Sequence, residues 1–65
     1  MEIAKHVTSN KGTVTINSRP ENGGTRYETE IKTATFSTPY YRGKDIDRAN
    51  KAYKDAVTLL NENNL

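Results

Sequence analysis

Few side chains in this 65-residue chain are of the types that perform chemistry. His6 is the only histidine, and there is no cysteine. A metal site needs several ligands in one place, so His6 is interpreted as an ordinary surface residue. No Ser-His-Asp order or nucleophile elbow is present, and Gly23-Gly24 is not followed by the lysine of a phosphate-binding loop. We therefore expect no metal site and no cofactor.

Two carboxylates, Glu28 and Glu30, are spaced to lie on one face of a strand. Paired carboxylates catalyse acid–base reactions where a cleft raises the pKa of one of them. An exposed sheet offers no such cleft, and Lys32 is expected beside the pair. We interpret these residues as a solvated face with cross-strand ion pairs, and we expect a protein that is not an enzyme.

A cluster of aromatic and basic residues spans positions 36–44. Aromatic rings beside arginine are typical of interface anchors, and they also suit base stacking combined with phosphate contacts. A plainer interpretation is that Phe36 and one tyrosine close the end of a small core. The partner-binding residues predicted from this cluster and from the helix that follows it are Tyr40, Tyr41, Arg42, Lys44, Arg48 and Lys51.

The basic residues are unevenly distributed along the chain. Residues 40–54 hold five basic and two acidic side chains, whereas residues 1–38 hold five basic and four acidic ones. This mild excess falls short of the strongly basic balance of dedicated nucleic-acid-binding proteins. It also fits an ordinary solvated helix face.

One amphipathic helix is predicted at about 45–61, because apolar residues recur there with a period near 3.6. Asp45 is its natural N-cap. Asparagines beyond Leu60 tolerate the left-handed turn of a C-cap, and we expect residues 62–65 to fray. A lone helix of this length is marginal in water, so its alanine-lined face must pack on something.

Three strands are predicted upstream, at about 2–8, 13–18 and 25–37. A tight turn at 9–12 with Gly12 at positive φ, and a loop at 19–24 containing Asn22-Gly23, separate them. A bulge or bend is expected between Lys32 and Thr35, because the apolar phase changes there. Tyr40 to Lys44 is expected to be a linker. The prediction is an α+β single domain (1–65): a three-stranded antiparallel meander with one C-terminal helix on one face, βββα.

The strand pattern also predicts which side chains face the helix. The open face of the sheet is expected to carry threonine, charged residues and His6. The helix-facing set is Ile3, Val7, Val14, Ile16, Tyr27, Ile31 and Phe36. The open-face set is Thr8, Thr13, Thr15, Glu28, Glu30 and Lys32.

The apolar content is low for a folded domain. Leu, Ile, Val and Phe make up 11 of 65 residues, with a net charge of +2. A core with so few apolar residues gains stability when the protein binds a partner or dimerises. A homodimer is therefore one expectation. The helix spacing Ile46, Ala49, Tyr53, Ala56 and Leu60 would suit a helix seam between copies, although the sheet needs the same face. No apolar run approaches a membrane span, and we expect a cytoplasmic protein.

Two functional hypotheses follow. The first is a small non-enzymatic protein that docks on another protein and modulates or inhibits it, as phage and mobile-element inhibitors of host enzymes or defence complexes do. A sheet edge able to accept a strand would contribute. The second is DNA binding, since a three-stranded sheet with one helix is also the plan of AP2-type and integrase arm-binding domains. The contacts predicted for it are Arg19, Arg26, Lys32, Arg42 and Lys44.

Overall fold

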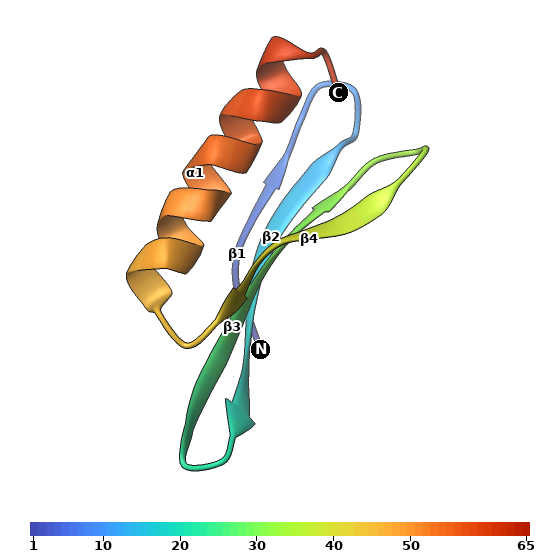
Figure 1. Cartoon of the computed structure of the whole chain (residues 1–65). Coiled ribbons are helices and arrows are strands. Elements are labelled where there is room, and N and C mark those ends of the chain that lie inside the picture. Colours follow the sequence, from blue (N-terminus) through green and yellow to red (C-terminus); the bar gives the residue numbers. More distant parts are fainter.

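The computed structural model describes residues 1–65 and contains one antiparallel sheet with one helix packed on it (Figure 1). The strands lie in sequence order, β1-β2-β3-β4. The α+β class and the C-terminal helix are confirmed, but there are four strands rather than three. The elements are β1 (Glu2–Val7), β2 (Thr13–Glu21), β3 (Gly24–Lys32), β4 (Ser37–Gly43) and α1 (Ile46–Glu62).

The fourth strand exists because the predicted third strand reverses direction at Thr33. The Thr33 hydroxyl accepts hydrogen bonds from the backbone N–H groups of Thr35 (3.3 Å) and Phe36 (3.2 Å). The Thr33 N–H donates to the Phe36 carbonyl at 2.8 Å. A side chain that satisfies backbone donors in this way stabilises a turn. The bend expected between Lys32 and Thr35 is therefore the turn of a hairpin. Most of the linker expected at Tyr40 to Lys44 belongs to β4, which ends at Gly43.

The β2–β3 hairpin has a two-residue turn, shorter than the predicted loop. Asn22 (φ 37°) and Gly23 (φ 79°) both adopt positive φ, as expected of an Asn-Gly turn. Pairing runs without interruption to Glu21 opposite Gly24. This hairpin projects beyond the start of α1 (Figure 1).

The predicted facing of β1 is wrong by one residue. Directly paired residues share a face, and β1 aligns Ala4 with Ile16 and His6 with Val14. Ala4 and His6 therefore lie on the helix side, and Ile3 and Val7 lie on the open face, 43% and 53% exposed.

The β1–β2 turn causes this reversal. It is closed by Thr8 N–H donating to the Gly12 carbonyl at 2.8 Å and by Lys11 N–H donating to the Thr8 carbonyl at 2.9 Å. The left-handed residue is Lys11 (φ 65°) and not Gly12. This closure places Val7 opposite Thr13, and a one-residue change of register reverses every side chain of a strand. Thr8, expected on the open face, is buried.

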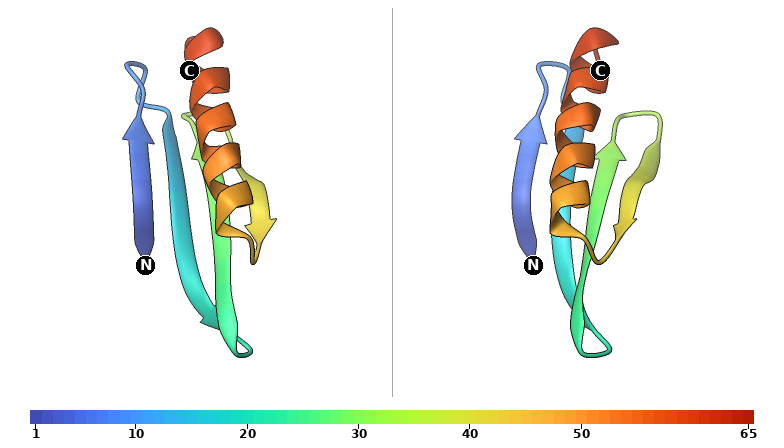
Figure 2. Two further views of the ribbon diagram at one scale, coloured as in Figure 1. Left: turned by 90° about the vertical axis from the view of Figure 1, so that its left-hand side faces the viewer. Right: turned by 60° about the vertical axis from the view of Figure 1, so that its left-hand side comes forward.

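The core lies between α1 and the central strands. α1 packs on β2, β3 and β4, while β1 lies to one side of it (Figure 2). Thr29 is fully buried and donates its hydroxyl to the Ala49 carbonyl at 2.9 Å, which joins sheet to helix. Phe36, expected in the core, lies in the β3–β4 turn and is 43% exposed. The buried apolar residues are Val14, Ile16, Ile31, Ala49, Ala56 and Leu60.

α1 begins at the predicted cap. The Asp45 carboxylate accepts hydrogen bonds from the N–H groups of Asp47 (2.9 Å) and Arg48 (3.2 Å). The helix-seam alternative fails, because Ala49, Ala56 and Leu60 of that seam are buried under the sheet. α1 is not long and apolar enough to cross a membrane.

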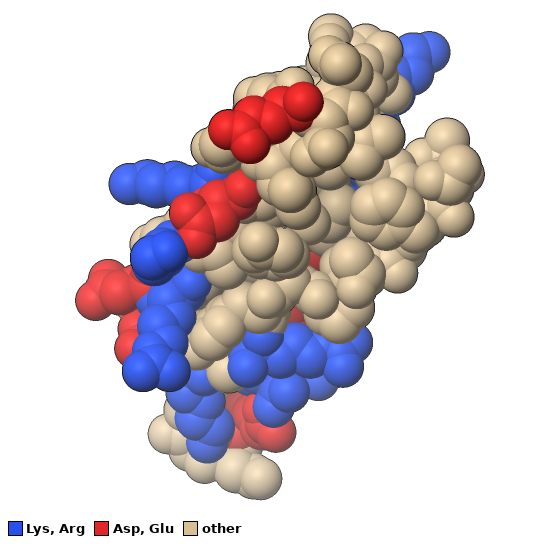
Figure 3. Space-filling model, turned by 45° about the horizontal axis from the view of Figure 1, so that its top comes forward, with Lys and Arg blue, Asp and Glu red and all other residues tan.

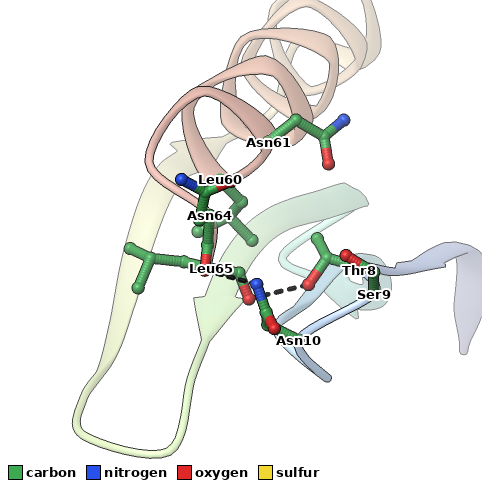
Figure 4. A pocket seen from close by; sticks show the side chains of 7 residues that line it. All are labelled: Thr8, Ser9, Asn10, Leu60, Asn61, Asn64 and Leu65. Carbon is green, nitrogen blue, oxygen red and sulfur yellow. Dashed lines mark hydrogen bonds between the residues drawn. The ribbon is translucent and has the colours of Figure 1, made fainter.

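The C-terminal tail, where we expected fraying, is bonded to the β1–β2 turn (Figure 4). The Leu65 carbonyl accepts from the Thr8 hydroxyl at 2.7 Å and from Gly12 N–H at 3.2 Å. The Asn64 carbonyl accepts from the Asn10 amide at 2.6 Å. Asn64 adopts the left-handed conformation (φ 56°), as the asparagine-rich end predicted.

Candidate functional site

The two tyrosines of β4 have different environments, although they are neighbours in sequence. β3 aligns Thr29 with Tyr41 but Glu30 with Pro39, so Tyr40 is an extra residue in β4. One residue without an opposite partner is a β-bulge, which bends the strand and redirects a side chain. Tyr40 is 45% exposed, whereas Tyr41 is half-buried.

Tyr41 is part of the fold. It lies opposite the buried Thr29 on the helix side, and its hydroxyl accepts from the Asp45 N–H at 3.2 Å. A Cβ atom on Gly43 would collide with the Tyr41 ring and hydroxyl. Tyr41 thus fixes the approach of the chain to α1, and we remove it from the predicted partner-binding set.

Tyr40 lies beside α1. Its phenol acts electrostatically on Lys51, whose ammonium donates to the Asp55 carboxylate at 2.7 Å. The hydrogen bond to Asp55 and the charge of Asp55 raise the pKa of Lys51 above the ordinary 10.5.

The basic residues around Tyr40 fall into two groups. Lys51 is held by Asp55, and Arg48 is held by Asp45 at 3.7 Å. Arg42 and Lys44 are exposed and form no ion pair. Arg42 lies opposite Glu28 on the open face of the sheet, and Lys44 lies in the connection between β4 and α1.

The basic residues predicted to bind DNA do not form one free surface. Arg19 pairs with Glu28 at 3.1 Å, and Arg26 pairs with Glu21 at 3.4 Å and with Glu28 at 3.6 Å. Arg19 and Arg26 are directly opposite one another, and the two carboxylates offset their repulsion. Figure 3 shows acidic side chains among the Lys and Arg side chains that gather in the lower half of that view. Lys32 lies on the open face without an ion pair.

The fold does not group the residues that the sequence offered as candidates for catalysis, Glu28, Glu30 and His6, into one site. Glu28 has the cross-strand ion pair that we expected, with Arg19 of β2, while Glu30 lies between Thr15 and Pro39. His6 is half-buried on the helix side, where we had expected it on the open face. No three His, Asp or Glu side chains are grouped as metal ligands would be.

The molecule has one small cavity, at the C-terminal end of α1 (Figure 4). It lies between the β1–β2 turn and the C-terminal tail. Thr8 and Asn10, which border it, are already bonded to the tail carbonyls. Its lining residues are Thr8, Ser9, Asn10, Leu60, Asn61, Asn64 and Leu65.

Comparisons with protein-family models, with curated proteins and with solved structures found no match to this chain. The functional interpretation therefore depends on geometry alone. The exposed residues Tyr40, Arg42, Lys44, Arg48 and Lys51 are called the docking surface below. All five residues belong to the set predicted from the sequence, which gave no sign that a bulge separates Tyr40 from Tyr41.

Proposed function

We propose that this protein is a non-enzymatic binding protein that docks on another protein through the docking surface and thereby modulates or inhibits it. The supporting observation is Tyr40, a large ring 45% exposed at the bulge of an edge strand. Arg42 and Lys44, two and four residues further along the chain, are exposed cations without an ion pair, and Arg42 lies opposite Glu28 in the sheet.

These side chains have complementary roles in recognition. Tyrosine and arginine are enriched among the few interface residues that dominate binding energy. Exposed charges around such an anchor steer association and select the partner. In this proposal Tyr40 supplies most of the affinity, and Arg42 and Lys44 supply orientation and specificity.

DNA binding has less support. Two of its five predicted contacts, Arg19 and Arg26, are bound to carboxylates that phosphates would have to displace. Glu30 adds a further negative charge to the open face of the sheet. Phosphate contacts by lysine and arginine supply most non-specific affinity for DNA, so paired arginines weaken this alternative.

The test is affinity capture of proteins from a nuclease-treated lysate, using the wild-type chain and Tyr40→Ala as bait. We expect Tyr40→Ala to reduce the yield of a specific protein about tenfold, the effect of losing ~1.4 kcal/mol of binding energy. Ile3→Ala is the matched control, because Ile3 is 43% exposed on the opposite edge strand. Equal capture by the wild type and Tyr40→Ala, with both variants folded by circular dichroism, would refute the proposal.

A further inference from the structure

β1 is the strand of the sheet that α1 does not cover. α1 packs on β2, β3 and β4, and β1 lies beside it (Figure 2). None of the six residues of β1 is buried, and its register with β2 shifts between Glu2 and Ala4. A strand with few buried contacts separates from its neighbour at a low cost in free energy. β1 therefore needs a further restraint to stay closed against β2.

The end of α1 turns the chain toward the β1–β2 turn. Asn64, in the left-handed conformation, donates its N–H to the Asn61 carbonyl at 3.3 Å, and Leu65 N–H donates to the Leu60 carbonyl at 2.8 Å. These two bonds around a left-handed residue are the Schellman motif, which ends many helices. Leu60 is fully buried, so the motif fixes Leu65 to the core of the molecule.

The tail formed in this way is bonded to the residues that follow β1. Thr8 comes directly after β1 and donates its hydroxyl to the Leu65 carbonyl at 2.7 Å (Figure 4). The Asn10 side-chain amide donates to the Asn64 carbonyl at 2.6 Å. These bonds tie the end of β1 to the end of α1, although α1 does not cover the strand itself.

We propose that the C-terminal tail, residues 63–65, is a latch that holds β1 closed, and that β1 opens separately from the other strands when the tail is released. In the open form the edge of the sheet is β2, with the buried side chains of Val14 and Ile16 beside the exposed backbone. The latch is at the opposite edge of the sheet from Tyr40 and does not depend on the docking surface.

Amide hydrogen exchange, followed by NMR in the full chain, tests the latch from the side of the turn. Asn10→Ala removes the bond to the Asn64 carbonyl. We expect the paired amides of β1 to exchange about fivefold faster, the effect of losing one hydrogen bond, while exchange in β3 and α1 stays unchanged. Ser9→Ala is the matched control, because Ser9 is an exposed residue of the same turn whose hydroxyl forms no hydrogen bond.

The latch is tested from the side of the tail by two changes at position 64. Asn64→Val resists the left-handed conformation, so the tail should leave the turn and exchange in β1 should again rise about fivefold or more. Asn64→Gly adopts this conformation readily, and we expect it to leave exchange in β1 within about twofold of the wild type.

Two results would overturn the proposal. Exchange in β1 that is the same in the wild type, Asn10→Ala and Asn64→Val would show that the tail does not hold the strand. Equal acceleration in β1, β3 and α1 would show that β1 opens only when the whole molecule unfolds.

Discussion

Two small residues join the sheet and its first turn to the C-terminal part of the chain: Gly12 contacts the tail, and Thr29 contacts α1. At Gly12, an added Cβ atom would lie 2.6 Å from the Leu65 carbonyl oxygen, which Gly12 N–H itself contacts. At Thr29, a buried hydroxyl of the sheet bonds the Ala49 carbonyl of α1. At this scale, individual side chains decide how closely the layers approach.

Gly12→Ala should destabilise the fold by about 1–3 kcal/mol, because the new methyl group must displace the C-terminal tail. Thermal unfolding measures this effect, and 1 kcal/mol corresponds to a shift of about 4–8 °C in a domain of this size. Gly24→Ala is the control, since its nearest neighbour would be the Glu21 carbonyl at 3.8 Å. A melting temperature unchanged by Gly12→Ala would mean that the tail is not held there.

Thr29→Val keeps the shape of the side chain but removes the hydrogen bond to Ala49. We expect a loss of about 1 kcal/mol in the free energy of unfolding, measured by urea denaturation. Thr15→Val on the open face makes the same chemical change without a hydrogen bond to the helix, and it should stay within about 0.5 kcal/mol of wild type. If both variants are equally stable, the Thr29 bond contributes nothing net.

At the scale of elements, α1 and β4 are each controlled by one local feature. The Asp45 cap sets where α1 begins, and the Tyr41 hydroxyl bonds the same residue. The bulge in β4 separates a structural tyrosine from an exposed one.

Asp45→Ala should cost about 1 kcal/mol of stability, because two N–H groups at the start of α1 lose their acceptor. Asp47→Ala is the control, since it removes the same charge near the same helix end without a capping bond. Its cost should be ~0.3 kcal/mol, from the helix dipole alone. Chemical denaturation of both variants makes the comparison, and equal losses would show that charge and not capping matters at Asp45.

At the scale of the whole molecule, the core is thin and one face of the sheet is open. Six apolar residues are buried in 65, and the longest dimension is 39 Å against 18 and 15 Å across. Such a molecule exposes much surface relative to its core. On the open face, Arg19 and Arg26 are paired with Glu28 and Glu21, whereas Lys5, Lys32 and Arg42 form no ion pair.

Random duplex DNA should show no salt-sensitive gel shift with this protein. The physical reason is that Arg19 and Arg26 are bound to Glu28 and Glu21. The assay is run at low and at physiological salt, because phosphate-driven binding weakens steeply between them. A shift at low salt that disappears in Lys32→Glu would establish the DNA-binding alternative.

Local chemistry explains what the sequence predicted correctly. The helix, its Asp45 cap, β2 and the Asn22-Gly23 turn each depend on residues a few positions apart, and those patterns are visible in a linear chain. The mixed aromatic and basic composition of positions 40–44 was visible in the same way.

Register explains what the sequence could not predict. Which side of the sheet Ile3 and Val7 occupy depends on how the β1–β2 turn aligns two strands, and a shift of one residue reverses the answer. Tyr40 and Tyr41 diverge because β4 gains one residue against β3. Glu28 pairs with Arg19 of β2, nine residues away, and not with Arg42, which lies opposite it in β4. Strand pairing is a relation between separate segments, so these features emerge only when the chain is folded.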